Sequence, residues 1–305
     1  MLDKFWESLG EDLAKRWVEH LFGPAGLFWL GGAVLALERG LAQQGWTAFL
    51  NLSAWLQGAL ALAAIAGVIG SALLMRLCVF PLLRGLEGYW VRQLRLWVTR
   101  PLVRRWHQRY ERARALQKKK TGEALSEAEQ LELTELETWL HQYPRRRGDL
   151  MPTRLGNLLR ARELAPRDKY GLDAVVCWAR LWGLLPSDLR EDLILARTAL
   201  NRRVEAFGWG MLFLLWVVIS WWAIPVAVVW MMVAYTQAVL AAAPYGDLIE
   251  TAFDLYRFRL YDALGWRRPP DSAAERAYGE ALSEFLWRGT VKEPVPYSPG
   301  PPHEG

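Results

Sequence analysis

The chain carries its apolar residues in long uninterrupted blocks rather than at the spacing of an amphipathic soluble helix. The longest block, residues 206–246, has 41 consecutive residues without a charge. As one straight helix it would extend about 60 Å, twice the roughly 30 Å of a bilayer's hydrocarbon core. We therefore predict two membrane spans, 206–222 and 225–243, because Pro225 suits the first turn of a new helix. One long, tilted helix is the alternative.

Two more apolar blocks precede this one. Residues 54–75 form 22 uncharged residues ended by Arg76, which predicts a span. Residues 21–37 have 17 uncharged residues, the short limit for a span, and a buried or interfacial helix is the alternative. A cleavable signal peptide is not expected, because acidic residues dominate the segment before this block.

Composition and charge set the class and orientation of the chain. With 52% hydrophobic and 23% charged residues, a disordered chain is excluded. Two cysteines exclude a disulfide scaffold and a four-thiolate zinc site. Of 37 basic residues, 25 lie within 84–205, whereas 38–53 contains only Arg39. The positive-inside rule then places 84–205 and both termini in the cytoplasm of a multi-pass membrane protein.

These patterns predict an all-α integral membrane protein. It has four transmembrane helices, with a cytoplasmic helical domain inserted between spans 2 and 3, and the lipid bilayer is its first partner. The predicted parts are a cytoplasmic N-terminal segment (1–20), a first transmembrane hairpin (21–83), a basic cytoplasmic helical domain (84–205), a second hairpin (206–243), amphipathic C-terminal helices (244–288) and a disordered Pro-rich tail (289–305).

Small residues recur every four positions in two of the spans. This helix-packing stripe comprises Ala59, Ala63, Gly67 and Ser71 in the second span and Ala234, Ala238 and Ala242 in the fourth. Such stripes let helix backbones approach closely, within one chain or across a homo-oligomer. Alanine-rich composition without a partner is the alternative. No ionisable side chain lies inside a span, which argues against a proton-coupled transporter but leaves an uncoupled pore open.

A basic, aromatic-rich stretch follows the second span. Residues 84–120 contain 12 basic and two acidic residues, interleaved with aromatic ones. We expect this stretch to lie on anionic lipid head groups. The candidate contacts are Arg92, Arg95, Arg100, Arg104, Arg105 and Arg109. Nucleic acid is less favoured, because the stretch begins at the bilayer. A solvated helix that binds neither lipid nor nucleic acid is the alternative.

Helix start signals mark the elements of the cytoplasmic part. Ser126 and Glu129 form a capping box before a helix whose acidic face is expected to pair with the preceding basic helix in a two-helix arm. Asp173 is expected to cap a later helix. Ser272 and Glu275 predict a second capping box before a helix that ends near Arg288.

No motif for chemistry stands out. The chain has neither a phosphate-binding glycine loop nor a nucleophile elbow. The four histidines (His20, His107, His141, His303) lack the spacing of a metal site. We therefore predict no catalytic, cofactor-binding or metal-binding residues, no cofactor, and a protein that is not an enzyme.

Three stretches carry a family resemblance. They are Glu87-Gly88-Tyr89-Trp90; Pro152-Thr153-Arg154-Leu155-Gly156-Asn157 with Tyr170-Gly171-Leu172-Asp173; and Phe253-Asp254-Leu255-Tyr256-Arg257 followed by Leu286-Trp287-Arg288-Gly289. Together they resemble a group of bacterial polytopic, four-span membrane proteins of unassigned function. The resemblance covers most of the chain from residue 54. It implies a location in the bacterial plasma (inner) membrane, and it implies no activity.

Three functions remain in view. The first is a membrane-anchored scaffold or sensor whose cytoplasmic domain binds a protein or ligand. The second is an oligomeric pore or channel gated by that domain, with the helix 187–207 as a lever. The third is a transporter or membrane enzyme. The missing intramembrane charges and the long cytoplasmic insert favour the first.

Overall fold

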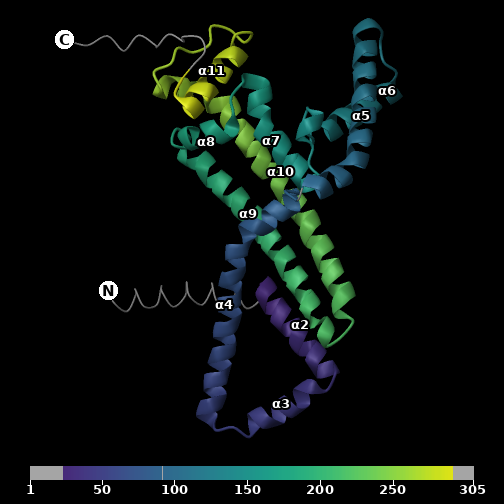
Figure 1. Cartoon of the computed structure of the whole chain (residues 1–305), viewed down its shortest axis with the longest axis vertical. Coiled ribbons are helices and arrows are strands. Elements are labelled where there is room, and N and C mark those ends of the chain that lie inside the picture. Colours follow the sequence, from purple (N-terminus) through teal and green to yellow (C-terminus); the bar gives the residue numbers. More distant parts are fainter. Residues whose placement is uncertain (1–22, 91, 291–305) are drawn as a thin grey trace, which may run out of the picture. The chain divides into compact units, whose positions relative to one another are not determined.

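The computed structural model describes residues 23–90 and 92–290, and every regular element in this part is a helix (Figure 1). The helices are α2 (Pro24–Glu38), α3 (Leu41–Leu50), α4 (Ala54–Glu87), α5 (Arg92–Gly122), α6 (Glu127–Leu140), η1 (Arg147–Asp149), α7 (Arg154–Tyr170), α8 (Ala174–Trp182), α9 (Ser187–Phe213), η2 (Leu214–Val218), α10 (Ala223–Ala263) and α11 (Glu275–Arg288). The prediction of an all-helical chain is confirmed. The predicted N-terminal segment and the tail from residue 291 lie outside the described residues.

The chain divides into two compact units. Among the described residues, the first comprises 23–83 and 201–238, and the second comprises 84–90, 92–200 and 239–290. The helices after residue 239 thus belong to the same unit as the basic region 84–200. The boundary falls inside α4, α9 and α10, which run on without a break.

Two helices are long and apolar enough to cross a membrane. They are α4 with 34 residues and α10 with 41 residues. α2 is apolar but has only 15 residues. The predicted span 206–222 consists of the end of α9 followed by η2, so it is not one regular helix. Two of the four predicted spans therefore coincide with helices of sufficient length.

The long uncharged block is two helices rather than one. α9 ends at Phe213 and is followed directly by η2, which ends at Val218. α10 begins at Ala223 with Pro225 in its first turn, as predicted. Pro244, in contrast, does not end α10, which continues to Ala263. A proline inside a helix removes one backbone hydrogen bond. Ala242 before Pro244 and Phe253 after it are both buried, so packing holds α10 on both sides of the proline.

Aromatic rings packed on glycines build the core of the first unit. A Cβ atom at Gly31 would lie 2.5 Å from the Phe213 ring, and one at Gly32 would lie 2.3 Å from the Trp216 ring. Phe28 of α2 lies between the Trp209 and Trp216 rings, at centroid distances of 5.2 and 5.3 Å. The absence of side chains at the two glycines is what lets these rings approach α2.

The two-helix arm is present in the second unit, where α5 and α6 pack side by side (Figure 1). The capping box of Ser126 and Glu129 is complete. Arg112 bonds Glu132 at 2.7 Å, and Lys119 bonds Glu129 at 2.7 Å. The hydrogen bond from Lys119, helped by the Ser126 backbone amide, lowers the pKa of Glu129 to about 2. The predicted charge pairing of the arm is therefore confirmed.

The rest of the second unit packs α7, α8, α9, α10 and α11 around one apolar core. Its fully buried members include Leu172, Cys177, Leu181, Leu193, Phe253, Leu260, Tyr261 and Leu282. Asp173 caps α8 as predicted, because its Oδ1 accepts a hydrogen bond from the amide of Val176 at 3.2 Å.

The predicted second capping box is wrong. α11 begins at Glu275 after Ala274, whose amide donates to Asp271 at 2.8 Å, and Ser272 has no capping role in the described structure. The Glu275 carboxylate instead accepts a hydrogen bond from Arg257 at 2.6 Å. A tertiary ion pair therefore competes successfully with the local cap.

Candidate functional site

The helix-packing stripe is open on one helix and buried on the other. Ala59, Ala63 and Gly67 of α4 are exposed, and a Cβ atom at Gly67 would meet nothing within 4 Å. Only Ser71 makes a packing contact, accepting a hydrogen bond from the Trp29 indole at 3.1 Å. The α10 members of the stripe, Ala234, Ala238 and Ala242, are all buried.

The predicted lipid-contacting arginines lie on α5. Arg100, Arg104, Arg105 and Arg109 are exposed. The Arg109 guanidinium lies 4.4 Å from the centre of the Trp139 ring, so it is partly engaged within the arm. The side chains of Arg92 and Arg95 lie outside the described part. Contact with lipid stays a prediction.

The first stretch of the family resemblance forms a close backbone contact with the second. Asn157 is buried, and its side chain accepts a hydrogen bond from the Met151 amide and donates to the carbonyls of Met151 and Thr153. Thr153 in turn donates to the Glu87 carbonyl at 3.1 Å. A Cβ atom at Gly156 would lie 1.9 Å from that same carbonyl oxygen, so glycine is required here.

A second backbone contact joins the α7–α8 turn to α11. Gly171 has φ +74°, and a Cβ atom there would lie 2.1 Å from the Arg276 carbonyl oxygen. A Cβ atom at Gly279 would lie 1.9 Å from the Tyr170 carbonyl oxygen. Ser283 secures the contact, because its Oγ accepts a hydrogen bond from the Asp173 amide at 2.8 Å. Its single hydroxyl hydrogen is shared between the Gly279 carbonyl of its own helix at 2.8 Å and the Gly171 carbonyl at 3.3 Å.

An ion-pair network joins α7 to the second half of α10. Arg162 bonds Glu250 at 2.6 Å and Asp247 at 2.7 Å. Lys169 bonds Glu250 at 2.7 Å and Asp254 at 3.0 Å. The pairs involving Glu250 are mostly shielded from water, so loss of one partner would leave an uncompensated buried charge. The network fixes the orientation of α7 on α10.

The network perturbs the pKa values of its members. Burial alone would raise the pKa of Glu250, but the hydrogen bonds and charges of Lys169 and Arg162 outweigh it and lower that pKa. Burial opposes protonation of Lys169, yet its bonds to Glu250 and Asp254 raise its pKa. Both groups are therefore charged at neutral pH.

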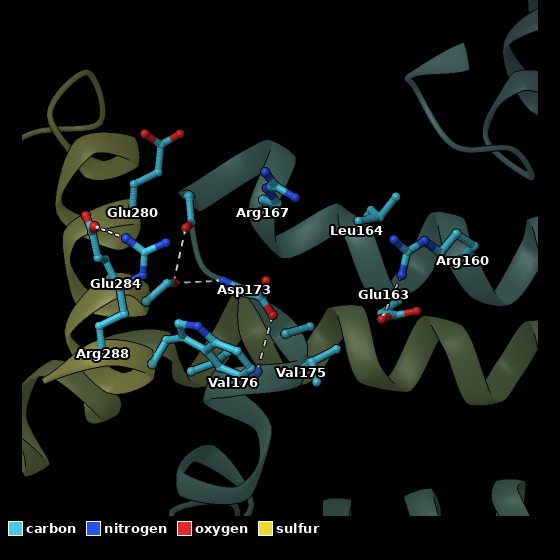
Figure 2. Close-up of a pocket in the computed structure, with 14 residues that line it drawn as sticks. Arg160, Glu163, Leu164, Arg167, Asp173, Val175, Val176, Glu280, Glu284 and Arg288 are labelled. Atoms are coloured by element: carbon cyan, nitrogen blue, oxygen red, sulfur yellow. Dashed lines mark hydrogen bonds and ion pairs between the residues drawn. The ribbon is translucent and has the colours of Figure 1, made fainter. Parts of the chain in front are cut away.

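Next to the contact between the α7–α8 turn and α11 lies an open pocket of about 530 Å³ (Figure 2). Figure 2 shows Arg160, Glu163 and Arg167 of α7 on one side and Glu280, Glu284 and Arg288 of α11 on the other, with the start of α8 forming the floor. This volume lies within the range of small-ligand sites.

Most charges in the pocket are already paired. Arg160 bonds Glu163 at 3.0 Å, and Arg288 bonds Glu284 at 3.3 Å. Within the described part of the chain, Arg167 has no carboxylate partner. Two large apolar side chains are also open to solvent, Val175 with 69% and Trp287 with 72% of their surface exposed. The pocket thus offers one free guanidinium beside apolar surface.

In the sequence, Asp173, Arg288 and the Tyr-Gly-Leu-Asp turn carry recognisable signals, but nothing connects them. Gly279, Ser283 and Glu284 were not predicted as site residues. Gly279 and Ser283 are four residues apart, the spacing of small residues at close helix contacts, and this was the available signal. Arg167 looked like one of many basic residues, because an unpaired charge is recognised only when its neighbours are known.

Within the described ranges, no group of three or more His, Cys, Asp and Glu side chains is placed to hold a metal ion. Cys177 is fully buried, and desolvation raises the pKa of its thiol to about 11. The pocket contains no activated nucleophile among its lining residues. Its arrangement suits binding.

No protein-family model, curated protein or solved structure matches this chain.

Proposed function

We propose that this chain is an integral membrane protein that acts as a membrane-anchored scaffold through its second unit. The observation that carries the proposal is the row of large apolar side chains exposed along α4 and α10. These include Leu60, Leu62, Leu73, Leu74 and Leu77 of α4, and Val228, Val229, Met232, Val233 and Leu240 of α10. Water-soluble monomers rarely expose apolar patches beyond a few hundred Å², whereas a bilayer solvates such surface.

In this proposal the spans 21–37, 54–75, 206–222 and 225–243 cross a bacterial plasma membrane. At about 1.5 Å per residue, the uncharged part of α4 is about 33 Å long, which matches the hydrocarbon core. The concentration of basic residues in 84–205 supports a cytoplasmic second unit.

The scaffold role rests on the pocket between α7, α8 and α11. Arg167 offers a fork of donors that fits a carboxylate, and Val175 and Trp287 offer apolar contact. The occupant we propose is an acidic protein segment with an apolar side chain next to its carboxylate. The backbone contact at Gly171 and Gly279 holds the three helices in place, so the pocket is preformed.

Membrane insertion is tested by single-cysteine labelling after replacing the two native cysteines. Thr47→Cys lies in the link between the first two predicted spans, and Arg146→Cys lies in the basic region. An impermeant maleimide should label Thr47→Cys in right-side-out vesicles and Arg146→Cys only after permeabilisation. Extraction of the chain by alkaline carbonate, or equal labelling of both positions, would refute the proposed topology.

Partner binding is tested by a photo-crosslinking residue at Val175 in the pocket, with Leu131 of α6 as the control, since both are solvent-exposed. The same acidic protein should crosslink repeatedly at Val175 and not at Leu131. Arg167→Glu should abolish this adduct because it repels the carboxylate. Adducts that are equal at both positions, or unaffected by Arg167→Glu, would contradict the scaffold proposal.

The oligomeric pore is the second candidate. The exposed row of Ala59, Ala63 and Gly67 on α4 is the observation that favours it, because a second copy of the chain could pack there. A closed assembly of several subunits in mild detergent, followed by ion conductance in a bilayer, would support it over the scaffold.

A further inference from the structure

A second pocket of the same unit, of about 510 Å³, lies where the helical unit meets the end of the fourth predicted span. α6 contributes Glu137 and His141, and α7 contributes Arg154 and Arg162. The remaining wall is the α10 segment 239–243. One face of the pocket is therefore charged and the other is apolar.

The apolar face belongs to the last turn of the predicted span. Leu240 has 65% of its surface exposed, and Val239 and Ala243 stand beside it in the pocket wall. Asp247, four residues beyond Ala243, is the first charged residue after the span. If the proposed membrane location holds, this wall lies at the boundary between hydrocarbon and head groups.

Among the described residues, two side chains of the charged face, one cationic and one anionic, have no ion-pair partner. Arg162 is neutralised by Asp247 and Glu250. Its Nη1 lies 3.3 Å from Nε2 of His141. Because a guanidinium has only donors, Nε2 accepts this bond and the His141 ring is neutral. The charges left over are those of Arg154 and Glu137.

Neither remaining charge has a partner of opposite sign among the described residues. Arg154 donates a hydrogen bond at 3.3 Å to the neutral side chain of Gln142. Glu137 accepts a hydrogen bond at 2.8 Å from the neutral side chain of Gln117. One pocket thus presents a guanidinium, a carboxylate and an apolar wall at membrane depth.

We propose that this pocket binds a phospholipid whose head group carries both a phosphodiester and a primary ammonium group, as phosphoethanolamine does. Arg154 would bind the phosphate, Glu137 would bind the ammonium, and the acyl chains would lie along Leu240. A quaternary ammonium has no hydrogen to donate to Glu137, and a glycerol head group has no cation. The inference rests on the proposed membrane location, but not on the partner-binding pocket.

The test uses the full-length protein in mild detergent and native mass spectrometry, with phosphatidylethanolamine and phosphatidylcholine of identical acyl chains. The wild type should bind phosphatidylethanolamine about tenfold more tightly, as one hydrogen bond between charged groups allows. Glu137→Gln should remove this preference while retaining lipid, and Arg154→Gln should weaken both lipids. Arg180→Gln, an exposed arginine of α8 outside this pocket, is the matched control and should bind as the wild type does.

Equal binding of the two lipids by the wild type, or a preference that survives Glu137→Gln, would overturn the proposal. The water-soluble head group glycerophosphoethanolamine distinguishes a lipid from a free phosphate compound. This head group compound should not bind at concentrations at which the diacyl lipid binds. Equally tight binding of the two would overturn the assignment to a lipid. Cysteine labelling at Thr47 and Arg146 reports separately on the membrane location, so the two failures are distinguishable.

Discussion

Replacing Gly279 with alanine should open the contact between α11 and the α7–α8 turn. The added Cβ would lie 1.9 Å from the Tyr170 carbonyl oxygen, whereas ordinary contact begins at 3.4 Å. The turn and the helix would have to separate by about 1.5 Å, because backbone atoms cannot turn aside as a flexible side chain does. That movement would break the hydrogen bond from the Asp173 amide to Ser283.

The magnitude follows from three contributions. Overpacking costs about 1–3 kcal/mol, and the hydrogen bond from the Asp173 amide to Ser283 contributes about 1 kcal/mol. Alanine is a better helix former than glycine by about 1 kcal/mol, which offsets part of the loss. We expect the free energy of unfolding of the second unit to fall by about 1–3 kcal/mol, and its midpoint to fall by roughly 2–12 °C.

Cys177 supplies the assay. Its thiol is completely buried and lies 4.0 Å from the Ser283 hydroxyl, so a thiol-reactive dye reaches it only when this core opens. In a Cys78→Ser background, the temperature of dye reaction reports on the second unit alone. Gly85→Ala is the control, since nothing lies within 4 Å of a Cβ there, and it should leave the midpoint unchanged or raise it. If Gly279→Ala reacts at the same temperature as Gly85→Ala, the close contact does not exist.

Three further substitutions test other contacts. Asn157→Ala should lower the same midpoint by an amount equivalent to about 2–4 kcal/mol, because it leaves the Met151 amide and carbonyl without their side-chain partner. An unchanged midpoint would show that other contacts hold the loop before α7. Gly67→Leu should leave the stability and the oligomeric mass by light scattering unchanged, because its surroundings are open within the chain, and a smaller mass would show that a second copy covers this face. Glu250 has a lowered folded-state pKa, so it stabilises the fold above its unfolded value of 4.5, and this contribution is lost as the pH falls through the folded-state pKa. The dye midpoint should therefore fall more steeply in acid for the wild type than for Glu250→Gln, and parallel curves would exclude this role.

Local signals in the sequence predicted what local chemistry determines. The capping box at Ser126, the Asp173 cap and the break near Pro225 depend on residues a few positions apart, and the structure has all three. The second capping box failed because Glu275 has a distant competitor, Arg257, which no local pattern reveals. Tertiary context overrides the local signal at this helix start.

The candidate site was largely beyond the reach of the sequence. The unpaired state of Arg167 emerges only after every neighbouring carboxylate has been assigned to another cation. Gly171 and Gly279 are separated by more than a hundred residues, and their contact has no periodic signature. The pattern predicted the starts of α6 and α8 correctly, because a helix cap depends on residues only a few positions apart.

The division of the second unit into two stretches of chain has a consequence for its synthesis. Residues 84–200 leave the ribosome well before Phe253, Tyr261 and Leu282, which complete their core. At about 5–20 residues per second, the roughly 80 residues between position 200 and Leu282 take about 4–16 s to make. During that interval the apolar faces of α7 and α8 lack the cover that α10 and α11 later provide. The newly made protein therefore passes through a stage in which part of this core is exposed, until α11 has been made.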